Sequence, residues 1–159
     1  MTTQAATIKF NSRSETHAEL SSFYVAPFTL DGEVWDTVEH YYQAQKFLPH
    51  DPEWAEQIRR APRAGAAKRM STSPEHTVRD DWDEVKEAAM LRGLRAKFGQ
   101  DRHCRQALLS TMDCRLVEYA PWGDRFWGDG GDGSGLNRLG QMLMELRDSQ
   151  IGVGDLHEL

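Results

Sequence analysis

Four side chains able to act on a ligand recur at helical spacing shortly after Trp35. They are a carboxylate, a phenol, an amide and an ammonium group at positions i, i+3, i+4 and i+7: Glu39, Tyr42, Gln43 and Lys46. Residues with this spacing share one face of a helix. A charged stripe that includes an aromatic ring is unusual on a surface helix, so we interpret this face as a pocket wall. The alternative interpretation is a solvated face with charge pairs.

The helix that positions these groups has a recognisable start. Asp36 or Thr37 is a suitable N-cap, and Asp36 with Glu39 three residues later approximates a capping box. The predicted helix spans residues 38–47. Just before it, Asp31-Gly32 separates two alternating segments and predicts a hairpin with a type I′ turn, whose two central residues need positive φ. The hairpin delivers the chain directly into the helix.

A glycine-rich segment is the second candidate for ligand binding. Five of the eight residues from Gly128 to Gly135, the glycine loop, are glycine, and a helix is predicted directly after them. Glycines before a helix N-terminus let backbone N–H groups approach a ligand, and the helix dipole favours an anion there. The alternative is a flexible surface loop, against which stand the nearby aromatic residues Trp122, Phe126 and Trp127.

Composition and charge restrict the class of protein. The chain has 159 residues, 39% of them hydrophobic and 28% charged, with a formal net charge of -6. These values fit a globular domain and lack the basic excess of a duplex-DNA binder. Neither a membrane span nor a signal peptide is expected. The two cysteines, Cys104 and Cys114, suit a reducing cytoplasm, which is the predicted location.

The remaining pattern predicts one α+β domain over residues 1–159, rich in helices and with a small β-sheet. Helices are expected over Asp51–Met70 (two pieces broken at Pro62), Trp82–Phe98 and Asp101–Thr111, and strands over Thr7–Phe10 and Leu116–Tyr119. The buried side of the longest helix is expected to carry Val85, Ala88, Leu91, Leu94 and Phe98. No histidine or cysteine cluster has metal-ligand spacing, so neither a metal nor another cofactor is expected.

Basic residues concentrate between positions 59 and 69. They are Arg59, Arg60, Arg63, Lys68 and Arg69. Such a cluster could meet phosphate, but the explanation that we favour is a solvated helix flank.

Three separated blocks of the sequence resemble the NADAR family, which is named for an association with NAD and ADP-ribose and is also called YbiA-like. The blocks are Trp35-x-Thr37-x-Glu39-His40-Tyr41-Tyr42-Gln43-Ala44-Gln45-Lys46-Phe47, then Trp82-x-x-Val85-Lys86-x-x-x-Met90 with Lys97-Phe98, then Asp124-x-x-Trp127-Gly128 followed by Gly135-x-Asn137-x-Leu139-Gly140. The similarity runs over residues 8–147. It implies an α+β fold and a metal-free N-glycosidase that cleaves a base or an amine from C1′ of a ribose.

The resemblance also implies roles for individual residues. Glu39 is the first candidate for the carboxylate that stabilises an oxocarbenium-like cation and activates water, and Asp124 is the second. The expected substrate-binding residues are Ser22, Phe23, Tyr42, Lys46, Trp127, Gly128, Gly135 and Asn137. Tyr42 and Trp127 are candidates for stacking, and Lys46 with the glycine loop before Asn137 for binding phosphate. The family's Ser-Asn-Phe element reads Ser21-Ser22-Phe23 here, which puts part of the pocket and the choice of substrate in question.

Three functions fit these residues. The first is hydrolysis of phosphoribosylated pyrimidine intermediates of riboflavin synthesis. The second is removal of ADP-ribose from guanine bases, in which a nucleic acid would take part only as substrate. The third is a non-catalytic sensor that binds ADP-ribose or NAD, which the presence of both Glu39 and Asp124 disfavours. The expected partner is therefore a small phosphorylated ribosyl substrate or an ADP-ribosylated guanine, and no membrane.

Overall fold

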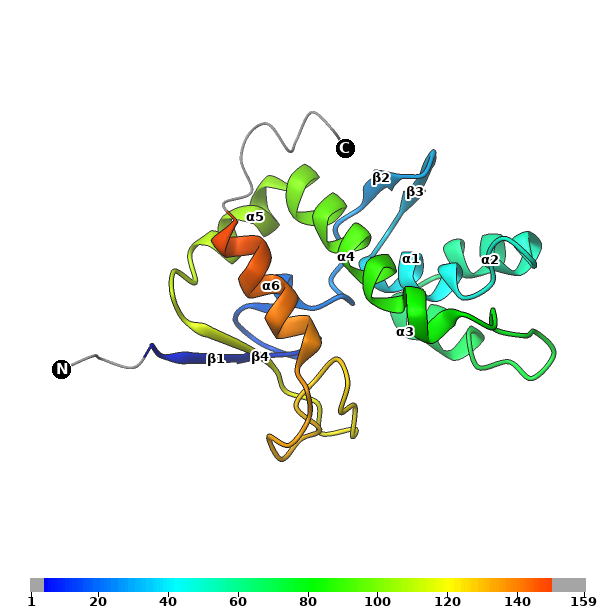
Figure 1. The fold of residues 1–159 in the computed structure, drawn as a ribbon. Helices are drawn as coiled ribbons and strands as arrows, with labels where there is room; N and C mark the ends of the chain where they lie inside the picture. The colour runs from blue at the N-terminus through cyan, green and yellow to red at the C-terminus, as the bar shows by residue number, and fades with distance from the viewer. Residues whose placement is uncertain (1–4, 150–159) are drawn as a thin grey trace. The chain divides into compact units, whose positions relative to one another are not determined.

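The computed structural model describes residues 5–149, which divide into two compact units (Figure 1). The first unit combines residues 5–21 with residues 102–149, and the second unit is the continuous segment Ser22–Asp101. The α+β class with helices dominant is confirmed, although the predicted small sheet is two separate two-stranded sheets. The assignment of residues 1–159 to a single domain stays a prediction.

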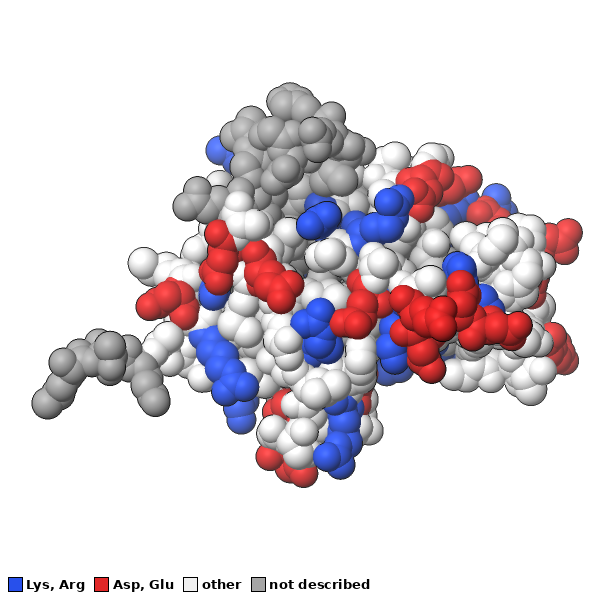
Figure 2. Space-filling view, in the orientation of Figure 1, with Lys and Arg blue, Asp and Glu red and all other residues white. Residues whose placement is uncertain are grey.

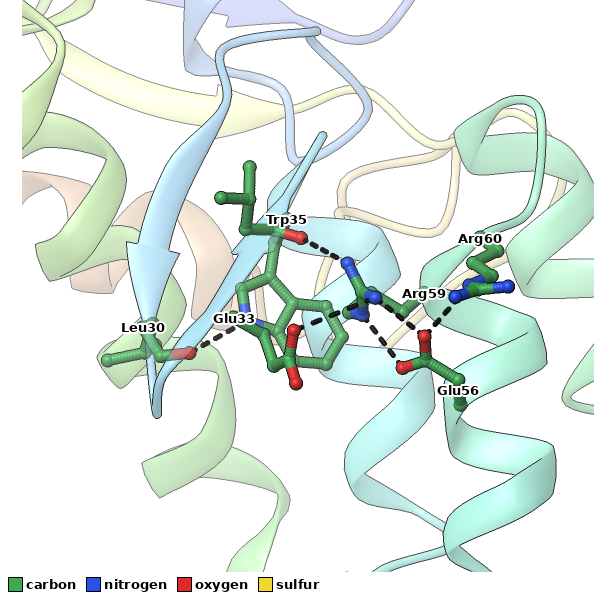
Figure 3. Close-up of polar contacts among 7 residues, drawn as sticks. Leu30, Glu33, Trp35, Glu56, Arg59 and Arg60 are labelled. Atoms are coloured by element: carbon green, nitrogen blue, oxygen red, sulfur yellow. Dashed lines mark hydrogen bonds and ion pairs between the residues drawn. The ribbon is translucent and has the colours of Figure 1, made fainter.

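The second unit opens with the predicted hairpin. Strand β2 (Phe28–Leu30) pairs antiparallel with β3 (Glu33–Trp35), with Phe28 opposite Trp35. The turn residues Asp31 and Gly32 have φ angles of 54° and 79°, so the predicted positive φ at both centres is confirmed. The Trp35 indole Nε1 donates a 2.9 Å hydrogen bond to the Leu30 carbonyl, which fixes the end of the hairpin (Figure 3).

Four helices complete the second unit: α1 (Val38–Gln45), α2 (Pro52–Arg59), α3 (Ala64–Met70) and α4 (Trp82–Gln100). Helix α1 packs against the other three and is buried over most of its length. A Cβ at Gly93 on α4 would lie 3.1 Å from Cγ1 of Val38, so α1 and α4 approach closely at this point. The helix that carries the candidate catalytic residue is thus the core of its unit.

The buried side of α4 differs from the prediction. Leu94 and Phe98 are buried as expected, but Ala88 is exposed and Val85 and Leu91 are only half-buried. The buried side includes Ala89, Met90, Gly93, Leu94, Ala96, Lys97 and Phe98. Small residues on this side allow the close approach of α1, and a pattern based on large apolar residues does not weigh them.

The first unit joins both ends of the described chain. Strand β1 (Thr7–Phe10) runs parallel to β4 (Arg115–Glu118), with Thr7 opposite Arg115. A short 3₁₀ helix (Ala18–Leu20), α5 (Arg102–Leu109) and α6 (Arg138–Asp148) complete the unit. Helix α6 packs against β4, and α5 packs against the 3₁₀ helix. Within residues 5–149, no helix is both long enough and apolar enough to cross a membrane.

Candidate active site

Glu39 is held in place by the first turn of α1. Thr37 is the N-cap, because its side chain accepts a 3.1 Å hydrogen bond from the His40 N–H. The backbone N–H of Glu39 itself donates to the Ser22 carbonyl at 3.1 Å. The predicted capping box between Asp36 and Glu39 is therefore wrong. The Glu39 carboxylate lies in the interior instead, where Ser22 and Gln43 supply its hydrogen bonds.

The Glu39 carboxylate is buried and receives one hydrogen bond on each oxygen. Ser22 Oγ donates to Oε2 at 3.2 Å, and Gln43 Nε2 donates to Oε1 at 2.7 Å. Only 5% of the residue is exposed. Burial raises the pKa of Glu39, and the hydrogen bonds from Gln43 and Ser22 and the charges of Lys68 and Lys46 oppose that rise. The result is a desolvated carboxylate whose basicity exceeds that of an exposed glutamate.

Lys46 lies about two helical turns after Glu39, on the same face and among aromatic rings. Its Nζ is 5.8 Å from the ring centre of Tyr42 and 5.8 Å from that of Trp82, and the two rings are 5.0 Å apart. Burial lowers the pKa of Lys46, while the Glu39 carboxylate acts to raise it. The predicted residues Tyr42 and Lys46 therefore lie together, with Trp82 as a neighbour that the prediction did not include.

A second lysine faces the same carboxylate from α3. The charge of Lys68 acts on both Glu39 and Lys46, lowering the pKa of each. Its Nζ lies 5.8 Å from the ring centre of Phe23, the residue after Ser22. One carboxylate, two ammonium groups and several aromatic rings thus gather in the second unit. Such a set suits a substrate with an anionic group and a ring.

Two arginines of the predicted basic cluster, Arg59 and Arg60, pair with carboxylates of their own surroundings. Arg59 lies between two carboxylates, 2.6 Å from Glu56 and 3.6 Å from Glu33, and Arg60 also pairs with Glu56 at 2.9 Å (Figure 3). Figure 2 shows that acidic and basic side chains are interspersed over the face of the molecule that it draws. Of the cluster, Lys68 is the residue whose charge acts on Glu39.

The remaining predicted residues belong to the first unit. One carboxylate oxygen of Asp124, Oδ1, accepts hydrogen bonds from the N–H groups of Phe126 and Trp127, at 3.0 and 2.9 Å. This arrangement is an Asx turn, which shapes the segment before the glycine loop. The Trp127 ring meets the Phe126 ring edge-on, with centres 4.8 Å apart. Asp124 and Trp127 stay site predictions that rest on the family resemblance.

The glycine loop is not an open cradle of donors. Gly130, Gly131, Gly133 and Gly135 all donate their N–H groups to oxygens of Asp124 or Asp129. At Gly135, a Cβ would lie 2.4 Å from the Gly128 carbonyl oxygen, so close packing of the loop on itself requires glycine there. The glycines serve the internal packing of the loop, and the geometric basis for predicting an anion site there is absent.

The N-terminus of α6 is likewise occupied by the chain itself. The N–H groups of Arg138 and Leu139 donate to the carbonyls of Phe126 and Trp127, at 3.0 and 3.1 Å. The Asn137 amide bridges to β4, where its Oδ1 accepts from the Glu118 N–H at 2.9 Å and its Nδ2 donates to the Leu116 carbonyl at 3.0 Å. Gly128, Gly135 and Asn137 therefore also stay site predictions on the resemblance alone.

The structure brings together one half of the predicted site in the second unit: Ser22, Phe23, Glu39, Tyr42 and Lys46. Gln43, which the helical spacing placed on the same face as Glu39, is confirmed on that face. The list of expected site residues missed two further neighbours in this unit, namely Lys68 and Trp82. Among the described residues, no group of three or more His, Cys, Asp or Glu side chains could hold a metal ion.

Comparison with known proteins gives the family. The model of the NADAR domain matches residues 9–150. N-glycosidase YbiA of Escherichia coli (strain K12) is 45% identical over 145 residues, covering 91% of this chain and 89% of that protein. The NMR structure of the E. coli protein YbiA superposes with a TM-score of 0.82 at 44% identity, covering 93% of this chain and 86% of the other.

A second relative is longer than this chain. A riboflavin biosynthesis protein of Vibrio vulnificus (strain YJ016) is 40% identical over 141 residues, which are 89% of this chain but 38% of that protein. The fold and these relatives define the class as N-glycosidases, hydrolases of N-glycosyl bonds. The chain belongs to the NADAR domain family.

Proposed function

We propose that this chain hydrolyses the C1′–N bond of phosphoribosylated pyrimidine intermediates of riboflavin biosynthesis. The observation that carries the proposal is the buried Glu39 carboxylate, hydrogen-bonded on both oxygens and influenced by the charges of Lys46 and Lys68. The choice of substrate is supported by the Vibrio vulnificus relative, which is named a riboflavin biosynthesis protein. The substrate is a small phosphorylated molecule, and Cys104 and Cys114 form no disulfide within the described residues, which suits a cytoplasmic reaction.

The chemistry assigned to Glu39 follows from its surroundings. Cleavage of a ribosyl C–N bond passes through an oxocarbenium-like cation at C1′. A buried carboxylate stabilises this cation strongly, because the low local dielectric strengthens the attraction between the charges. The raised pKa of Glu39 makes its ionised form a stronger base for activating the attacking water.

The two lysines and the rings complete the proposed pocket. Lys46 and Lys68 supply positive charge for the substrate phosphate, and Tyr42 supplies a face on which the pyrimidine or the sugar stacks. Asp124, Trp127, Gly128, Gly135 and Asn137 are retained as proposed site residues on the strength of the family motif. Asn137 is assigned the supporting role that its hydrogen bonds to β4 suggest.

The proposal is tested by direct product analysis. The purified chain is incubated with a ribosylaminopyrimidine 5′-phosphate, and release of ribose 5-phosphate and of the free aminopyrimidine is followed by mass spectrometry. Both products are expected in equal amounts. If this substrate is untouched while guanine carrying ADP-ribose is cleaved, the ADP-ribosyl glycohydrolase alternative replaces the proposal. If neither is cleaved but ADP-ribose binds, the chain is a sensor.

A further inference from the structure

Gln43 has a buried acceptor that the protein leaves unused. The residue is 4% exposed, and its Nε2 donates a 2.7 Å hydrogen bond to Glu39 Oε1. Its own Oε1 is buried and has no hydrogen-bond partner among the described residues. Buried polar atoms are almost always paired, since an unpaired one loses its hydration without compensation. This exception lies on the amide that touches the candidate catalytic carboxylate.

The orientation of the Gln43 amide is set by Glu39. An ionised carboxylate only accepts hydrogen bonds, so the amide must present its NH₂ group to Glu39. Turning the amide over would place two oxygens against each other at the 2.7 Å separation. The carbonyl oxygen is therefore fixed next to the carboxylate as an acceptor, and a hydrogen-bond donor is missing.

We propose that Gln43 Oε1 accepts a hydrogen bond from the substrate at the reacting ribose, so that Gln43 both positions Glu39 and selects substrates carrying a donor beside C1′. The inference rests on the proposed function and adds a specificity residue to it. Two groups beside C1′ are donors of this kind: the 2′-hydroxyl of the ribose and the N–H of the glycosidic nitrogen.

The 2′-hydroxyl would bind more tightly as the reaction proceeds, because the positive charge that develops at C1′ polarises its O–H bond and strengthens the hydrogen bond to a carbonyl oxygen. The glycosidic nitrogen leaves with the electron pair of the broken bond, so its N–H would contribute to substrate choice alone. A buried acceptor rejects an analogue that lacks either donor, because the acceptor then stays unpaired. With the 2′-hydroxyl as donor, Gln43 contributes to kcat as well as to substrate choice.

The test pairs enzyme variants with substrate analogues. Wild type and Gln43→Met are compared on a ribosylaminopyrimidine 5′-phosphate, on its 2′-deoxy analogue and on its N-methyl analogue. Methionine fills the glutamine volume but neither donates to Glu39 nor replaces the amide acceptor. Removal of the hydroxyl also alters the intrinsic reactivity of the sugar, so the quantity compared is each analogue's kcat/KM relative to the parent substrate, in each enzyme.

One of the two analogues lacks the group that donates to Gln43 Oε1. For that analogue, the relative kcat/KM is expected to be about tenfold to a hundredfold lower in wild type than in Gln43→Met. The other analogue should give the same ratio in both enzymes, which identifies the donor. Equal ratios in the two enzymes for both analogues would overturn the inference. If Gln43→Met does not fold by circular dichroism, Gln43→Leu, which also lacks the acceptor, takes its place.

The positioning role has a separate readout. The hydrogen bond from Gln43 lowers the pKa of Glu39, so its loss should shift the acid limb of the kcat/KM profile to higher pH. The matched control is Gln45→Met, since Gln45 is a half-buried glutamine on the same helix and is not one of the hydrogen-bond donors to Glu39. This control should leave the limb in place, and an unmoved limb in Gln43→Met would refute the role. Absence of any hydrolysis by wild type would instead reject the proposed function.

Discussion

Replacement of Glu39 by glutamine removes one charge from the candidate site while keeping the shape of the side chain. Glutamine can still accept from Gln43 Nε2, and its own amide can donate to Ser22 Oγ, so both contacts of the carboxylate have a counterpart. At an effective dielectric of ~20, a charge ~4 Å from a developing cation contributes about 4 kcal/mol, or roughly a thousandfold in rate. We expect kcat to fall by about that factor.

The assay measures release of ribose 5-phosphate in single-turnover experiments, so that product release does not mask the chemical step. Glu53→Gln is the matched control, because Glu53 is an exposed glutamate on α2, away from Glu39 in the sequence. It should retain wild-type turnover. A folded Glu39→Gln variant with near wild-type kcat would remove Glu39 from the catalytic role.

Glu39→Gln is expected to lower kcat but to raise the thermal stability of the chain. Burial raises the folded-state pKa of Glu39 above its unfolded value, so the folded chain binds this proton more tightly. Stability therefore falls as pH rises above the unfolded pKa, and the ionised side chain is a cost at neutral pH. Glu39→Gln should raise Tm at pH 7 and lose this advantage in acid, as calorimetry at both pH values would detect. A variant that is less stable than wild type at pH 7 would contradict the sign.

Three further perturbations test other parts of the molecule. Lys46→Ala should weaken binding of a phosphorylated ribosyl substrate more than binding of its dephosphorylated form, because only the phosphorylated form carries the negative charge that the Lys46 ammonium group would attract. Equal losses of affinity in calorimetry would assign Lys46 another role. Hydrolysis should survive EDTA with at most a modest loss, and abolition of turnover that Mg²⁺ or Mn²⁺ restores would contradict a metal-free mechanism. Gly135→Ala should destabilise the chain by about 1–3 kcal/mol, because the new Cβ would lie 2.4 Å from a backbone oxygen. Gly65→Ala on α3, whose Cβ would meet nothing within 4 Å, should leave Tm unchanged or raise it, and equal melting shifts would refute the argument from packing.

Local chemistry made much of the fold predictable. Asp31-Gly32 predicted a turn because few residues tolerate positive φ, and Thr37 predicted the start of α1 because its hydroxyl caps a backbone N–H. The parallel pairing of β1 with β4 has no such local signal. It joins Thr7 to Arg115, and parallel partners carry no turn between them to mark their register.

Spacing alone predicted the candidate site only where its residues share a helix, and Ser22 and Phe23 were expected from the family motif. Glu39, Tyr42 and Lys46 follow from spacing alone, but spacing gives no warning that Ser22 completes the carboxylate's hydrogen bonds. Lys68 was counted with its basic neighbours because sequence shows the charge and not the direction of the side chain. The hydrogen bonds within the glycine loop were not predictable for a related reason, since only its three-dimensional path brings the Phe126 and Trp127 carbonyls to the start of α6.

The division into one continuous and one discontinuous unit has a consequence for the order of folding during synthesis. Residues Ser22–Asp101 are contiguous, so the hairpin and its four helices can assemble as soon as that segment has left the ribosome. Strand β1 is made first but must wait for β4, which lies more than one hundred residues later and closes a long loop at an entropic cost. The pairing that joins the two ends of the first unit therefore forms late, after the helix that carries Glu39 is already in place.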